Sequence, residues 1–305
     1  MPRLSRLLAA TTLLASGTLV HSHPASQEVA RQLPATGPNY RFSFGDSYSE
    51  TRFNPNGTLP NPANPLGNPD APPSGPNWVT YGTTKYNHSV VYTYNYASNG
   101  ATIDDDLVEP SDPSSRTLTD QVNDFLAGAG KKPSATPWTS ENSLFSIWIG
   151  MFDIEYTYFL SGNRDLFSDQ LLDAEFPLVK KLYDAGARNF LFNNVAPINR
   201  TPRMLRQPSS AQAKQAEVID GFNARLSSWI RDFGSKHTDA KIFFFDANAR
   251  FTSILNNPKT YGFKDAKSYG SGDDFFWMND FQPGSRANDY IAQVVGKDVL
   301  GNTVW

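Results

Sequence analysis

A serine follows a short hydrophobic run near the start of the chain, in a position suited to nucleophilic chemistry. Residues 40–44, with the sequence YRFSF, lead directly into Gly45, Asp46 and Ser47. Parallel sheets build their sites at the carboxyl ends of strands, so this turn makes Ser47 a candidate nucleophile. A Gly-Asp-Ser triplet is common by itself. The alternative interpretation is a turn serine that caps the next element.

Thiol and imidazole side chains, which often serve as nucleophile, base or metal ligand, are scarce in this chain. There is no cysteine, and the histidines are His21, His23, His88 and His237. This composition excludes a thiolate nucleophile, a disulfide framework and cysteine-ligated metal sites. We expect no metal and no cofactor. His237 lies in a polar turn and His88 inside a glycosylation sequon, so neither is expected to reach Ser47.

The elements that must position Ser47 follow a repeating pattern. Short β-branched and aromatic runs alternate with helical patterns, which is typical of a parallel sheet covered on both faces. The predicted strands are residues 40–45, 90–96, 143–150, 189–195 and 241–246. We therefore predict an α/β fold, a three-layer sandwich with about five parallel strands. Residues 23–305 are expected to form one domain.

Two helices are clear from the sequence. After Pro208, apolar residues recur every three or four positions between 218 and 233, which predicts an amphipathic helix lying on the sheet. A second helix is expected over residues 168–185, with a left-handed cap at Gly186. Its internal Pro177 predicts a kink or a break.

Residues 52–77 are dense in Pro, Asn and Gly. Such a stretch is a long ordered loop or a linker. Because it follows the first predicted strand, we favour a wall of the functional site over a domain linker.

The amino-terminal residues and the charge indicate where the protein acts. Residues 1–22 combine early arginines, a short apolar run and a small-residue end, which is typical of a signal peptide cleaved near Ser22. We therefore expect a secreted, extracellular protein, with sequons at Asn56, Asn87 and Asn199 as plausible glycan sites.

The net charge is −3 and no basic cluster is present, so nucleic acid is not an expected partner. No later apolar run is long enough to suggest a membrane span.

Two segments carry a resemblance to a known family. Residues 42–48 (FSFGDSY) and 95–102 (NYASNGAT) resemble the first two sequence blocks of the GDSL or SGNH hydrolases, specifically the secreted fungal acetylesterases that act on carbohydrate. The resemblance extends to about the carboxyl terminus and implies the flavodoxin-like SGNH hydrolase fold. It also implies that Ser47 holds the nucleophile position, and that the backbone N–H groups of Ser47 and Gly100 belong to the oxyanion hole.

The other two blocks depart from the family pattern. Where the family reads Gly-x-Asn-Asp, this chain has Phe152 in place of the asparagine that donates to the oxyanion. Where the family reads Asp-x-x-His-Pro, this chain has Asn279 at the acid position and Gln282 at the base position. An amide oxygen accepts a hydrogen bond but is not a useful base near neutral pH. The alternative interpretation of these three residues is pocket lining.

These observations predict a secreted ester hydrolase-like protein, related to acetylesterases, whose hydrolysis is crippled. Two alternatives remain, a non-catalytic extracellular carbohydrate-binding protein and an active esterase that uses an unrecognised base. The expected ligand is a small-molecule or oligosaccharide ester. Asn77 and Trp78 resemble the family's cleft entrance and are candidate substrate-binding residues; a core tryptophan at a helix start is the alternative.

Overall fold

The computed structural model describes residues 37–67 and 75–305. Its sheet has the strand order β2-β1-β3-β4-β5, and every neighbouring pair is parallel. The strands are β1 (Asn39–Gly45), β2 (Val91–Asn95), β3 (Ser143–Trp148), β4 (Asn189–Asn193) and β5 (Lys241–Phe245). Each coincides closely with a predicted strand, so the predicted fold class is confirmed. The predicted signal peptide, residues 1–22, lies outside the described residues.

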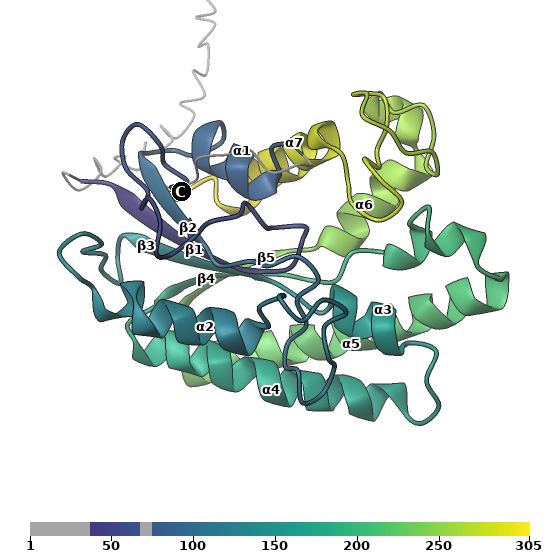
Figure 1. Ribbon diagram of the computed structural model, residues 1–305, viewed down its shortest axis with the longest axis horizontal. Helices are drawn as coiled ribbons and strands as arrows, with labels where there is room; N and C mark the ends of the chain where they lie inside the picture. Colours follow the sequence, from purple (N-terminus) through teal and green to yellow (C-terminus); the bar gives the residue numbers. More distant parts are fainter. Residues whose placement is uncertain (1–36, 68–74) are drawn as a thin grey trace, which may run out of the picture. The chain divides into compact units, whose positions relative to one another are not determined.

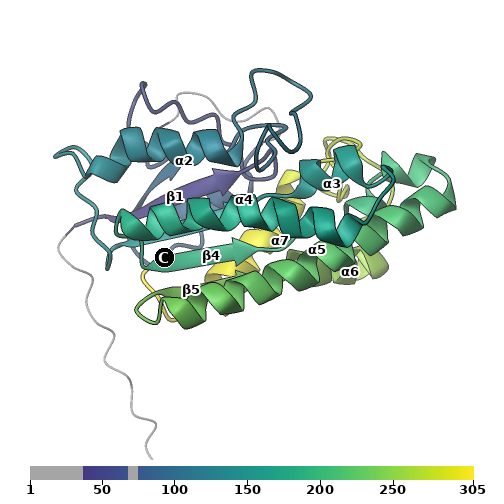
Figure 2. The ribbon, with the colours of Figure 1, turned by 90° about the horizontal axis from the view of Figure 1, so that it is seen from below.

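Helices cover both faces of this sheet (Figure 1). One face carries α2 (Leu118–Ala127), α3 (Met151–Thr157), α4 (Arg164–Asp184) and α5 (Ser209–Lys236), which lie in front of the sheet in Figure 2. The other face carries α1 (Trp78–Thr84), α6 (Ala247–Asn256) and α7 (Ser285–Val294). Short helical turns complete the chain: η1 (Ala129–Lys131), η2 (Ile198–Arg200), η3 (Met204–Arg206), η4 (Pro258–Tyr261) and η5 (Val295–Val299).

Burial explains why the sequence pattern located the strands. Every residue of β1, β3 and β4 is buried, as expected for central strands covered on both faces, whereas the edge strand β5 is partly exposed. The apolar stripe of α5 faces the core through Val218, Phe222 and Leu226, as predicted. The candidate residues lie along the carboxyl edge of this buried sheet.

The second predicted helix is longer than expected. It begins at Arg164, capped by the side chain of Asn163, and continues through Pro177 to Asp184. Of the two outcomes predicted at Pro177, the break does not occur. Gly186 has a φ of 113°, so the left-handed residue predicted at the end of the helix is confirmed.

The described part of the Pro-rich loop packs along the sheet. The backbone N–H of Thr93 in β2 donates to the carbonyl of Pro65 at 2.8 Å, so the loop covers the open edge of β2. Covering an edge strand blocks its pairing with other chains.

Candidate functional site

Ser47 lies in the turn that follows β1, and its neighbours fix that turn tightly. Gly45 has a φ of 151°, and a Cβ there would collide with the Trp148 carbonyl oxygen, so only glycine fits. The Gln121 side chain accepts from the Gly45 N–H at 2.9 Å and donates to its carbonyl at 2.8 Å. Asp46 Oδ1 accepts from the Tyr48 N–H at 2.9 Å. Ser47 itself is 7% exposed.

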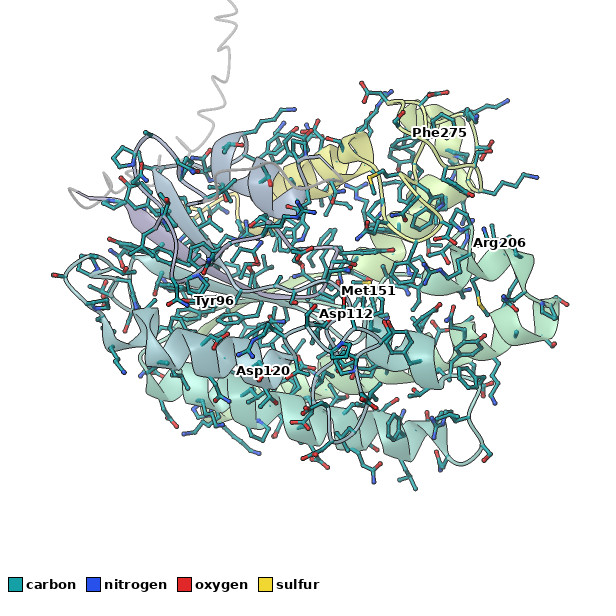
Figure 3. The ribbon with its side chains drawn as sticks, in the orientation of Figure 1. Tyr96, Asp112, Asp120, Met151, Arg206 and Phe275 are labelled. Carbon is teal, nitrogen blue, oxygen red and sulfur yellow. The ribbon has the colours of Figure 1, made fainter. Side chains whose placement is uncertain are left out.

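The structure brings the five residues predicted around the nucleophile into one pocket of about 330 Å³. These are Ser47, Gly100, Phe152, Asn279 and Gln282. The pocket is also lined by residues that were not predicted to belong to the site, which are Asn99, Ser111, Asp112, Ser115, Tyr156, Arg203 and Phe281. The pocket lies at the carboxyl edge of the sheet, and Figure 3 labels Asp112, which belongs to its polar wall. No described residue of the Pro-rich loop lines it, so the predicted role of that loop as a wall of this site is not supported.

The segment that carries Gly100 is tied to both neighbouring elements. Gly100 has a φ of 75°, which places it in the left-handed region that favours glycine. The Ser98 N–H donates to the Gly45 carbonyl at 3.0 Å, and the Ile103 N–H donates to Asp153 Oδ1 at 3.0 Å. Gly100 is therefore held between the turn of Ser47 and the first turn of α3.

Phe152 gives the pocket a hydrocarbon wall. It lies in the first turn of α3 and is 6% exposed. Its ring packs against the rings of Tyr156 and Phe281, with centroids 5.5 and 5.2 Å away. A phenyl ring in this position offers no hydrogen-bond donor to a ligand oxygen.

Asn279 and Gln282 form a hydrogen-bonded amide pair. Asn279 Nδ2 donates to Gln282 Oε1 at 3.0 Å, while Asn279 Oδ1 accepts the backbone N–H groups of Phe281 and Gln282. The Tyr48 hydroxyl donates to the Phe281 carbonyl at 2.7 Å, which joins this loop to the turn of Ser47. Rotating either amide exchanges a donor for an acceptor but creates no basic atom.

Ser47 Oγ is buried and has no hydrogen-bond partner among residues 37–67 and 75–305. The two described histidines lie at the amino ends of strands. His88 precedes β2 and its Nδ1 is 3.1 Å from the Thr303 carbonyl, while His237 precedes β5 and packs on Tyr183. A five-residue strand spans roughly 17 Å, so neither reaches the pocket. His21 and His23 lie outside the described residues.

The carboxylates near the pocket are engaged by other groups. Asp280 pairs with Arg203 at 3.1 Å and with Arg206 at 2.7 Å. Partial burial raises its pKa, but the hydrogen bonds from Arg206 and Arg203 outweigh this and hold the pKa below its ordinary value. The backbone N–H and hydroxyl of Ser114 likewise lower the pKa of Asp112. A carboxylate with a lowered pKa is a poor general base at neutral pH.

Three other carboxyl groups are buried near the site without charged partners. One oxygen each of Asp46, Asp153 and Glu175 has no hydrogen-bond partner within the described part of the chain. Burial raises the pKa of Asp153 to about 7 and that of Glu175 to about 8, and it holds the pKa of Asp46 well above its ordinary value. Burial thus disfavours the charged form of Asp46, and its Oδ1 already accepts the Tyr48 N–H.

The predicted substrate-binding role of Asn77 and Trp78 is wrong for this pocket, since neither residue lines it. Trp78 is 1% exposed, and its indole Nε1 donates to Ser49 Oγ at 3.1 Å. Asn77 caps α1 by accepting the backbone N–H groups of Val79 and Thr80. The alternative interpretation, a core tryptophan at the start of a helix, is the correct one.

The described residues contain no cluster of three or more side chains suited to hold a metal ion. Within the same residues, no helix combines the length and apolar character that crossing a bilayer requires.

The profile of GDSL-like lipases and acylhydrolases matches residues 42–295. The chain belongs to this family. An acetylesterase of Thermothelomyces thermophilus is 37% identical over 262 residues, which cover 84% of this chain and 86% of that protein. A GDSL esterase/lipase of Arabidopsis thaliana is 29% identical over 184 residues, 56% of this chain and 52% of the relative.

A solved structure supports the assignment of the fold. The crystal structure of a GDSL-like lipase candidate from Parabacteroides merdae aligns with a TM-score of 0.52 and 14% identity. The alignment covers 88% of this chain and 100% of that one. The fold is thus the SGNH hydrolase α/β fold, as the resemblance implied.

Proposed function

We propose that this GDSL-family protein is a secreted relative of carbohydrate acetylesterases that keeps the nucleophile position but has lost most of its hydrolytic power. Ser47 is the residue at the nucleophile position, and Gln282 is the residue at the position of the base. The observation that carries the proposal is that Gln282 pairs with the Asn279 amide in the same pocket as Ser47. An amide pair in place of an acid and a base cannot accept the serine proton.

The expected loss of hydrolytic rate is large. Removing the base from a serine triad costs about a millionfold in turnover. Losing one oxyanion donor, as Phe152 implies, costs about a hundred- to a thousandfold, although such losses are not additive. The backbone N–H groups of Ser47 and Gly100 remain as donors in this scheme and leave only slight residual hydrolysis.

An unrecognised base is not supported among the described carboxylates. Asp280 and Asp112 are engaged by arginines and by Ser114, and both have lowered pKa values. Asp46 is fully buried, and burial disfavours its charged form. The two described histidines lie at the far edge of the sheet, so neither they nor these three carboxyl groups are placed to serve as the base of Ser47.

The second candidate function is carbohydrate binding without catalysis, and the composition of the pocket favours it. Hydroxyl, amide and charged side chains from Asn99, Ser111, Asp112, Ser115 and Arg203 line the pocket. Such groups hydrogen-bond to sugar hydroxyls, and the rings of Tyr156 and Phe281 add apolar surface. The proposed ligand is an acetylated sugar or oligosaccharide, a class suggested by the acetylesterase relative. Secretion remains part of the proposal, resting on the pattern of residues 1–22.

The purified protein is expected to hydrolyse a simple acetyl ester at nearly the same rate as its Ser47→Ala variant. No imidazole takes the serine proton, so the hydroxyl adds little to the background rate. The measurement is the initial rate of the two proteins on one acetyl ester at neutral pH. A wild-type rate more than about a hundredfold above that of the variant would show general-base help and refute the proposal.

A further inference from the structure

A buried arginine lies on β1, between β2 and β3, away from the Ser47 pocket. Arg41 is on β1, and its residue is 3% exposed. Its guanidinium lies 4.5 Å from the ring of Trp78 in α1. Gly82 of the same helix leaves room for it, since a Cβ there would lie 2.7 Å from Nη1. The arrangement of α1 thus accommodates a positive charge inside the fold.

Among the described residues, no acidic group pairs with that charge. Arg41 Nε donates to Ser146 Oγ at 3.3 Å, and Nη2 has no hydrogen-bond acceptor in residues 37–67 and 75–305. No ion pair of Arg41 occurs within the same residues. Burial lowers the pKa of Arg41 to about 9, which still leaves it charged at neutral pH. An unpaired buried charge is costly, and the contact with Trp78 offsets only part of this cost.

Arg41 lines a cavity of about 10 Å³ that also has a second unsatisfied donor in its wall. Trp305 lines the same cavity, is 6% exposed, and its indole Nε1 has no acceptor in the described part of the chain. The Ser89 hydroxyl donates to the Val304 carbonyl at 2.6 Å and so fixes the adjacent backbone. Apolar side chains, including Val91 and Val295, form much of the remaining wall.

We propose that this cavity binds one small inorganic anion, of which chloride is the physiological example. The volume is about that of one water molecule. A monatomic anion such as chloride is somewhat larger and requires a small outward shift of the lining side chains, whereas polyatomic carboxylates and phosphates are far too large. An anion would accept from both unsatisfied donors and neutralise Arg41, whereas a water molecule would satisfy the donors and leave the charge uncompensated. The cavity shares no residue with the Ser47 pocket, so this site is independent of the proposed function.

The test is the melting temperature of the full chain in chloride, with gluconate holding the ionic strength constant. A ligand that binds only the folded state adds about 1.4 kcal/mol for each tenfold rise in its concentration above the Kd, here roughly 3–5 °C. Arg41→Met is expected to abolish the chloride dependence. Arg286→Met is the matched control, because Arg286 stacks on Phe263 at the surface and should keep the dependence.

A second variant and a direct observation guard against a misfolded Arg41 variant. Trp305→Phe removes one donor while keeping a ring, and is expected to weaken chloride binding about tenfold or more. In bromide-grown crystals of the wild type, an anomalous peak is expected between Arg41 and Trp305. A melting temperature indifferent to chloride, or a cavity that holds water alone in bromide, would overturn the inference.

Discussion

Replacing Phe152 by Asn, Asn279 by Asp and Gln282 by His together will create an acetylesterase at least about a thousandfold faster than the wild type. Ser47 and Gly100 already share the pocket, and Asn279 already holds the side chain of residue 282 at 3.0 Å. The new aspartate would accept from the new histidine in the same arrangement, and the histidine would accept the Ser47 proton. The new asparagine would restore the third oxyanion donor.

Each single change should leave the protein nearly inactive. A histidine without its acid samples the wrong tautomer and orientation, which costs about ten-thousandfold. Adding Ser47→Ala to the triple variant should remove the new activity, and initial rates on one acetyl ester measure all of these proteins. If the triple variant folds with unchanged circular dichroism but shows no turnover that depends on Ser47, the cleft itself differs from that of an esterase. The carbohydrate-binding alternative would then be favoured.

Glu175→Gln will stabilise the protein at pH 8 and have little effect at pH 5. Glu175 is 2% exposed, and burial raises its pKa to about 8. The folded protein therefore holds a proton that the unfolded chain releases above its ordinary pKa. The stability contributed by this group is fully present below that ordinary pKa and is lost as the pH rises towards 8. The slope is up to about 1.4 kcal/mol per pH unit between the two pKa values, so the gain at pH 8 is on the order of 4 kcal/mol.

The measurement is urea unfolding of the two proteins between pH 5 and pH 8. Glu217→Gln is the control, because this residue lies on the exposed side of α5 and the same chemical change there should leave the profile unaltered. Parallel stability profiles for wild type and Glu175→Gln would contradict the raised pKa.

The strands could be predicted because buried strands read as apolar runs, and the rule that sites form at the carboxyl ends of parallel strands singled out Ser47. The resemblance to the family's sequence blocks predicted Gly100, Phe152, Asn279 and Gln282. Contacts between distant residues could not be predicted in this way. The Gln121 side chain hydrogen-bonds to the Gly45 backbone 76 positions away in the chain, and no local pattern indicates this contact. Trp78 was predicted to bind sugar because the sequence does not show that it is buried. Its burial depends on how α1 packs against the rest of the fold.

The ion pairs around the pocket could not be predicted from the sequence either. Asp280 adjoins Asn279 in the chain, and no local pattern identifies the partners of its carboxylate. The structure pairs it with Arg203 and Arg206, which approach from η3 and the turn before it. This pairing lowers its pKa and strengthens the conclusion drawn from Gln282.

The central claim is that no base activates the Ser47 hydroxyl. Its most direct test is labelling of Ser47 by a fluorophosphonate, which reports hydroxyl activation whatever ester the protein prefers. Mass spectrometry of the intact wild type and of its peptides is the readout. The Ser47→Ala variant serves as the blank, and the triple variant serves as the positive control. We predict that wild-type Ser47 stays unlabelled under conditions in which the triple variant is modified. A stoichiometric adduct on wild-type Ser47 would prove that a base activates it. The protein would then be an active esterase, contrary to the proposal.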